Sequence, residues 1–113
     1  QHPVILDGEV LTKYFECDLR TGNTLPSRAF SPGGGCGTLS GSASAIFLRG
    51  GNPHMFDLQS GTGAALNHVS RPGCFVNIIP AGGIISIPES SSGCTCSYPL
   101  QASFAYVPTE IAQ

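Results

Sequence analysis

The chain has no tryptophan, and charged residues make up only 11% of its 113 residues. That fraction lies well below the roughly 25% of ordinary soluble domains. The five basic residues are scattered singly, and the formal net charge is −2. Because nucleic-acid binding needs a clustered basic surface, the composition argues against a nucleic-acid partner.

Long apolar runs and helical periodicity are missing as well. No run of about 18 apolar residues is present, so we expect no membrane-spanning helix. Short β-rich runs alternate instead with glycine, proline and serine, which predicts an all-β chain with no significant helix. The runs that predict strands are Val4–Leu6, Glu9–Cys17, Ser44–Arg49, His54–Leu58, Phe75–Ile79, Ile84–Ile87, Thr95–Tyr98 and Ala102–Val107.

An internal repeat organises these runs. The segment CDLRTG at Cys17–Gly22 returns as FDLQSG at Phe56–Gly61, and the two aspartates stand 39 residues apart (57 − 18). In these segments Asp18 and Asp57 can accept backbone N–H bonds of a turn. Gly22 and Gly61 then take the positive-φ position without steric cost. The pattern predicts a tight hairpin between two outer strands of each unit.

A second series of similar segments follows a period of 38. GCGTLS begins at Gly35 and GCFVNI at Gly73 (73 − 35), and the strand residues from Ala45 and from Gly83 show the same offset. A period near 40 with several short strands fits the blade of a β-propeller. We therefore predict one all-β domain over residues 1–113. It would contain about three blade-like units, approximately 1–34, 35–72 and 73–113.

These motifs also resemble those of a known family. YFECDLRTGN and HMFDLQSG look like the blade-ending motif of PQQ-like (quinoprotein-type) β-propellers. The stretch Arg71–Pro108, with its Arg-x-Gly-Cys segment and Cys-Thr-Cys-x-Tyr ending, resembles the C-terminal region of secreted PQQ-like propeller proteins of planctomycete-type bacteria. The resemblance runs from Glu9 to Pro108 and implies a propeller-like fold. Two departures are the missing tryptophan, common in family blades, and a unit count too small to close a ring alone.

The five cysteines indicate an oxidising compartment, and so a secreted, extracellular or periplasmic protein. Cys94 and Cys96 are separated by one residue, which in a strand places them on one face about 7 Å apart. A disulfide does not tolerate that Cα separation, so we expect each to bond a different partner. The candidate partners are Cys36 and Cys74, which follow glycine in successive units.

The odd cysteine is Cys17. It stands where the second copy of the repeat has Phe56, and cysteine can fill a core position as a small apolar side chain. We expect a buried free thiol there, with an intermolecular bridge or a place in a rearranged set of bridges as the alternatives. Zinc usually takes Cys-x2–4-Cys spacing, so the sequence favours disulfides over a metal site and predicts no metal ligand.

No catalytic residue stands out. A Ser-His-Asp triad can be drawn from a histidine, His54 or His68, with Asp57 and Ser70, but no Gly-x-Ser-x-Gly marks the serine as a nucleophile. Cofactor-binding residues stay unassigned, and the chain is more consistent with a non-enzyme. Arg49 and Arg71 are candidate anion contacts, because an arginine at a strand end can bind a carboxylate or hold loop carbonyls.

Two functions remain. The first is a secreted, disulfide-stabilised structural or binding module without a cofactor. It would assemble as a homo-oligomer or filament, or with a partner chain that completes the propeller, through the strand edges Pro3–Leu6 and Ser103–Val107. The alternative is a C-terminal fragment or subunit of a PQQ-like propeller oxidoreductase, and only then do we expect PQQ or haem.

Overall fold

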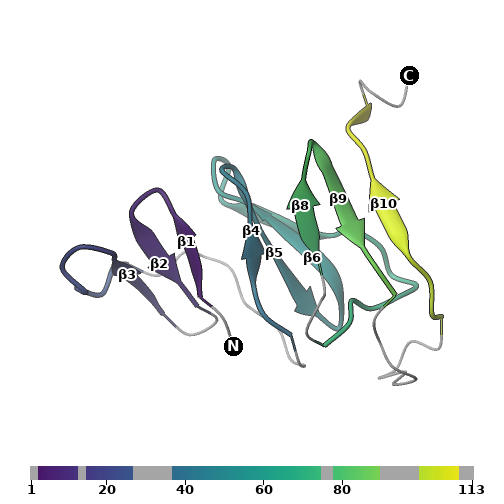
Figure 1. Cartoon of the computed structure of the whole chain (residues 1–113), viewed down its shortest axis with the longest axis horizontal. Coiled ribbons are helices and arrows are strands. Elements are labelled where there is room, and N and C mark those ends of the chain that lie inside the picture. The colour runs from purple at the N-terminus through teal and green to yellow at the C-terminus, as the bar shows by residue number, and fades with distance from the viewer. Residues whose placement is uncertain (1–2, 13–14, 27–36, 75–77, 90–99, 110–113) are drawn as a thin grey trace.

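A computed structural model describes residues 3–12, 15–26, 37–74, 78–89 and 100–109. Its ten elements are all β-strands, arranged in three antiparallel sheets that we call sheets A, B and C (Figure 1). Sheet A contains β1 (Val4–Leu6), β2 (Glu9–Leu11) and β3 (Glu16–Asp18). Sheet B contains β4 (Ser40–Gly41), β5 (Ala45–Gly50), β6 (Asn52–Asp57) and β7 (Thr62–Ala65). Sheet C contains β8 (Ile79–Ala81), β9 (Ile84–Ile87) and β10 (Phe104–Tyr106).

The prediction of an all-β chain is confirmed. The described residues form three separate sheets and close neither a barrel nor a propeller ring. Each sheet falls within one of the three units expected from the repeat. None of the described elements is a helix that could cross a membrane.

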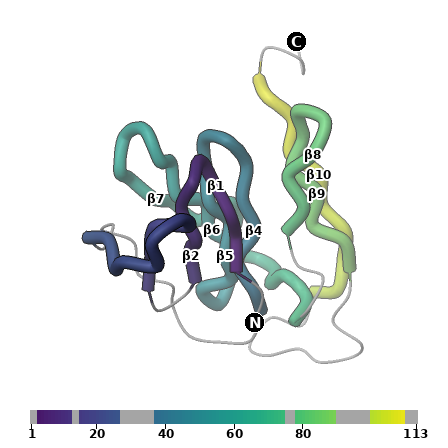
Figure 2. Tube along the Cα trace, turned by 60° about the vertical axis from the view of Figure 1, so that its left-hand side comes forward, coloured from purple at the N-terminus to yellow at the C-terminus, as the bar shows by residue number. Residues whose placement is uncertain are grey.

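The sheets stand side by side as layers, with sheet B in the middle (Figure 1), and the turned view shows sheet C on one side of the other two (Figure 2). The first strands of the three units are neighbours, because β1 contacts β4 and β4 contacts β8. Gly41 in β4 allows the closest of these approaches. A Cβ atom added there would lie 2.9 Å from Val4 Cγ1 and 3.1 Å from Leu6 Cδ1.

Strand β5 is buried on both faces because it lies at the centre of the middle layer. Side chains alternate along a strand, so its residues divide between two apolar clusters. Ile46 and Leu48 point toward sheet A, and Ala45 and Phe47 toward sheet C. The A–B cluster comprises Leu11, Leu39, Ile46, Leu48 and Phe56. The B–C cluster comprises Ala45, Phe47, Ile78 and Ile87, with Met55, Leu66, Ile85, Phe104 and Tyr106 packed against it.

The predicted strands agree with the structure in part. The run Glu9–Cys17 is wrong as one strand, since it folds back between β2 and β3, where the Thr12 amide donates to the Phe15 carbonyl at 2.9 Å. The short strands β4 and β7 were not predicted, because Ser40–Gly41 and Thr62–Ala65 are small and polar for strands. The expected strand Thr95–Tyr98 and most of Phe75–Ile79 lie outside the described residues.

The period of 38 for the strand residues is wrong by one. In sheet B, Gly41 pairs with Ile46, and in sheet C, Pro80 pairs with Ile85. Ile46 and Ile85 are therefore equivalent, 39 residues apart (85 − 46), like the two aspartates. The difference matters because a shift of one residue moves a side chain to the opposite face of its sheet.

Candidate functional site

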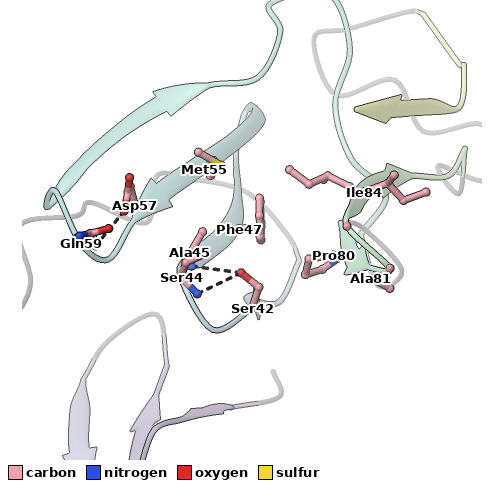
Figure 3. A pocket seen from close by; sticks show the side chains of 13 residues that line it. Ser42, Ser44, Ala45, Phe47, Met55, Asp57, Gln59, Pro80, Ala81 and Ile84 are labelled. Carbon is pink, nitrogen blue, oxygen red and sulfur yellow. Dashed lines mark hydrogen bonds between the residues drawn. The ribbon is translucent and has the colours of Figure 1, made fainter. Parts of the chain in front are cut away.

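A pocket of about 600 Å³ opens between sheets B and C at the end where the β4–β5 and β8–β9 turns lie (Figure 3). Its apolar wall includes Ala45, Phe47 and Met55 of sheet B and Ile85 of sheet C. Its polar lining side chains are Ser42, Ser44, Asp57 and Gln59. None of the described lining residues is a histidine, cysteine, lysine or arginine.

Two of these polar groups already serve the turns that carry them. The Ser42 hydroxyl accepts the amides of Ser44 at 3.4 Å and Ala45 at 3.2 Å, as Figure 3 shows. The Asp57 carboxylate accepts the Gln59 amide at 2.8 Å. The pocket therefore presents an apolar wall beside polar groups committed to turn structure.

A related pocket of about 470 Å³ lies between sheets A and B. Leu6 and Leu11 line it, and their counterparts Ser42 and Phe47 line the B–C pocket. The counterparts follow from pairing, since β1 and β2 meet as β4 and β5 do. Both pockets thus arise where neighbouring units meet, as a product of the repeat.

The two predicted aspartate turns have nearly the same hydrogen bonds. Asp18 Oδ1 accepts the amides of Arg20 at 2.8 Å and Thr21 at 2.9 Å. The Gly22 amide donates to the Asp18 carbonyl at 2.8 Å, and Gly22 has a φ of +73°. These bonds close the turn that follows β3.

The second turn repeats this geometry one period later. Asp57 Oδ1 accepts the amides of Gln59 at 2.8 Å and Ser60 at 3.4 Å. The Gly61 amide donates to the Asp57 carbonyl at 2.9 Å, and Gly61 has a φ of +72°. The two turns are therefore structural, as the sequence pattern predicts.

Backbone amides set the charge state of the first turn. The hydrogen bonds from the amides of Thr21 and then Arg20 lower the pKa of the Asp18 carboxyl below its usual 3.8. A carboxylate that accepts backbone N–H groups is stabilised in its ionised form.

The two arginines noted in the sequence come together at a cysteine. Arg49 and Arg71 are only 3% and 7% exposed. Arg49 Nη1 lies 3.5 Å from Cys74 Sγ, and Arg71 Nη1 lies 3.9 Å from the same sulfur. Arg71 Nη1 also donates to the Pro72 carbonyl at 3.0 Å. This last contact is the loop-holding use expected for an arginine at a strand end.

Two of the five cysteines lie in the part of the chain that the structure describes. Cys17 and Cys74 carry free thiols, and both are half-buried. The other three candidates, Cys36, Cys94 and Cys96, lie outside the described residues. The proposed pairing of Cys94 and Cys96 with separate partners therefore stays a prediction, and Cys74 is not bridged in this structure.

The triad drawn from the sequence is not assembled. The Ser70 hydroxyl donates to Asn67 Oδ1 at 3.1 Å, and His54 Nδ1 lies 2.9 Å from the Asn52 carbonyl. Asp57 instead serves its turn. The three side chains thus have different partners and form no relay. His68 Nδ1 lies 3.0 Å from Asn52 Nδ2.

Sequence reasoning missed the role of the segment between β7 and β8. The Leu66 amide donates to the Pro53 carbonyl of sheet B at 2.7 Å. Asn67 Nδ2 donates to the Tyr106 hydroxyl of sheet C at 2.7 Å, and Asn67 Oδ1 accepts the Ser70 amide at 3.0 Å. This segment ties sheets B and C together. No sequence motif predicts the contact between Asn67 and Tyr106, because the two residues are 39 positions apart.

A scan against protein-family models, a search of curated proteins and a search of solved structures each returned no match to this chain. In the described residues, no group of three or more His, Cys, Asp or Glu side chains is placed to hold a metal ion.

Proposed function

We propose that this chain is a secreted structural or binding module whose three sheets act as blade-like units and which works by assembly. The observation that carries the proposal is the difference in cover between the middle sheet and the two outer sheets. The central strand β5 of sheet B is buried on both faces, whereas sheets A and C leave large apolar side chains exposed. These are Ile5, Ile79 and Ile84, with Leu19 and Val107 directly after the ends of β3 and β10.

The arrangement of first strands supports a blade-like character for each unit. β1, β4 and β8 are neighbours, and later strands of each sheet lie progressively farther from them in the order of pairing. A β-propeller is built from repeated sheets of this size around an axis. Three units span only part of such a ring, so an arc of this kind needs something to cover its two ends.

Strand edges offer one way to assemble. In sheet C, β10 is hydrogen-bonded on one side, to β9, and in sheet A, β1 is hydrogen-bonded on one side, to β2. An edge strand presents unpaired backbone groups that can pair with another chain. The expected contacts at Pro3–Leu6 and Ser103–Val107 remain part of this proposal.

The proposal is tested by the native mass of the purified chain. Sedimentation velocity from low to high micromolar concentration should give species heavier than the 11.7 kDa monomer. A chain that stays folded and monomeric throughout this range contradicts assembly with itself. Disulfide stabilisation is tested separately by peptide mapping without reduction, in which Cys94 and Cys96 should appear in two different bridges. Because Cys17 and Cys74 are free thiols in the structure, one of these bridges would have to recruit one of them or a cysteine of another chain.

The alternative is a part of a PQQ-like propeller oxidoreductase. The neighbouring first strands favour it as much as the module, because both need blade-like units. Native material with quinone or haem absorbance bands would support this alternative. A featureless visible spectrum would support the module.

A further inference from the structure

Strand pairing defines two opposite faces on each sheet, because directly paired residues share a face. We call the first the head face. Its central rows are Ile5–Val10–Cys17 in sheet A, Gly41–Ile46–Phe56 in sheet B and Pro80–Ile85–Tyr106 in sheet C. We call the second the tail face. Its rows are Val4–Leu11–Glu16, Ser40–Phe47–Met55 and Ile79–Ser86–Ala105.

Within the chain, a tail face always packs on the head face of the following sheet. Leu11 on the tail face of sheet A joins Ile46 and Phe56 on the head face of sheet B in one cluster. Phe47 on the tail face of sheet B joins the cluster that Ile85 and Tyr106 of sheet C pack against. The same kind of interface therefore occurs twice.

Two halves of this interface have no counterpart among the residues that the structure describes. They are the head face of sheet A, where Ile5 is 58% exposed, and the tail face of sheet C, where Ile79 is 43% exposed. The turn leucines show the same contrast. Leu58 packs against the A–B cluster, whereas Leu19, at the equivalent position 39 residues earlier, is 50% exposed.

We infer that a second copy of this chain occupies these faces head to tail. The head face of sheet A in one copy would pack on the tail face of sheet C in the other. Ile5 is the counterpart of Gly41, which lies against Val4 and Leu6. The counterparts of Val4 and Leu6 in sheet C are Ile79 and Ala81, so Ile5 of one copy would lie against these two residues of the next. Because isoleucine is larger than the glycine at position 41, the first strands of the two copies would stand farther apart than β1 and β4 do.

The choice of a second copy rests on the match between the two open faces, both of which are apolar. The open head face of sheet A corresponds to the head faces that sheets B and C bury within the chain. The open tail face of sheet C corresponds to the tail faces that sheets A and B bury. A contact between unlike faces is heterologous, so it closes into a ring or continues as a filament. This inference rests on the proposed assembly function and specifies the surfaces that perform it.

The test uses one charged substitution on each face. Ile5→Glu blocks the head and leaves the tail open, and Ile79→Glu does the reverse. Each variant alone should be monomeric in sedimentation, with self-association weakened more than about tenfold, because a carboxylate would be buried without a partner. Val69→Glu is the matched control, since Val69 is 56% exposed in the segment between β7 and β8 and lies on neither face. It should associate like the wild type.

Mixing the two monomeric variants gives the decisive measurement. One intact head and one intact tail remain, so an equimolar mixture should form a 1:1 dimer that grows no further. Circular dichroism checks that each variant keeps its β-sheet signal. Ile5→Ser and Ile79→Ser replace the glutamates if either variant unfolds.

Three results would overturn the inference. A wild-type chain that is monomeric at every concentration removes both the inference and the self-assembly proposal. An oligomer that resists both substitutions, or whose mixed variants give no dimer, removes the inference alone and leaves assembly through strand edges. Association lost only on blocking the head, with Ile79→Glu unaffected, would indicate contact between like faces.

Discussion

The three strands of sheet A and the first three strands of sheet B are paired in the same order, yet the two sheets have different surroundings. Ile46 on the head face of sheet B is fully buried, whereas its counterpart Val10 in sheet A is only half-buried. Leu58 and Leu19 each follow the aspartate of their own turn, and the two turns are equivalent. Leu58 is packed, whereas Leu19 is exposed. The comparison teaches that burial is set by the neighbouring sheet, while the fold of each unit is set locally.

The largest difference in the free energy of unfolding should appear when an isoleucine on a covered face and one on an open face are each shortened to alanine. Ile46→Ala should lower the free energy of unfolding by about 2–4 kcal/mol, because it removes buried methyl groups and leaves a cavity. Ile5→Ala is the matched control on the open face and should change it by less than about 0.5 kcal/mol. Urea unfolding of both variants, at a concentration where the chain is monomeric, measures the two effects. Equal losses would mean that the head face of sheet A is covered.

The close approach of β1 to β4 gives the next largest effect. Gly41→Ala should cost about 1–3 kcal/mol, because the new Cβ lies within contact distance of Val4 and Leu6. Adding Val4→Ala should recover part of this loss, since the side chain at 2.9 Å is shortened. Thermal unfolding of the two single variants and the double variant measures the coupling. If the losses simply add, sheets A and B do not meet at this position.

The two glycine turns should respond alike despite their different surroundings. Gly22→Ala and Gly61→Ala place an alanine at a φ of +73° and +72°, with no atom within 4 Å of the new Cβ. The cost is therefore backbone strain of about 1–2 kcal/mol at each site. Asparagine, which tolerates this conformation better, should cost less at both. A large inequality in chemical denaturation would show that the turns are not equivalent.

The smallest expected effect is the pH dependence of stability that the Asp18 carboxylate of sheet A produces. Its pKa is lowered in the folded state, so the unfolded chain takes up the proton first as the pH falls. The stability that this carboxylate contributes is present above pH 3.8 and is lost as the pH falls through the lower folded pKa. Asp18→Asn should therefore lose less stability than the wild type on acidification, measured as the difference in Tm between pH 6 and pH 3. An identical acid response would contradict the role of the turn amides.

The sequence predicted the local features well. The turns at Asp18 and Asp57 follow from side-chain and glycine chemistry within five residues, and the strands from short apolar runs. The predicted period of the strand residues was one residue too short. Sequence similarity between short segments cannot distinguish an alignment that keeps each side chain on the same face of its sheet from one that moves it to the opposite face. Pairing of Gly41 with Ile46 and of Pro80 with Ile85 decided this.

The candidate site was harder to predict. Arg49 and Arg71 were recognised as unusual, but their contacts with Cys74 were not predicted. They depend on how the segment between β7 and β8, which carries Arg71 and Cys74, packs against Arg49 of β5. The contact of Asn67 with Tyr106 likewise joins distant parts of the chain. Tertiary contacts of this kind leave no periodic signal in a single sequence.

Every strand pair in the described residues joins strands that follow one another in the chain. β5 and β6 are linked by Gly51 alone, with Gly50 paired to Asn52. A β-protein usually folds slowly, because distant segments must find each other before their contacts stabilise them. Here sheets A and B can form from local hairpins, as can β8 and β9 of sheet C, whereas β10 follows β9 only after residues 88–103. The packing of one layer on the next is long-range as well. Folding should therefore begin at the β5–β6 hairpin and spread outward, with the two outer layers the last to form and the first to open.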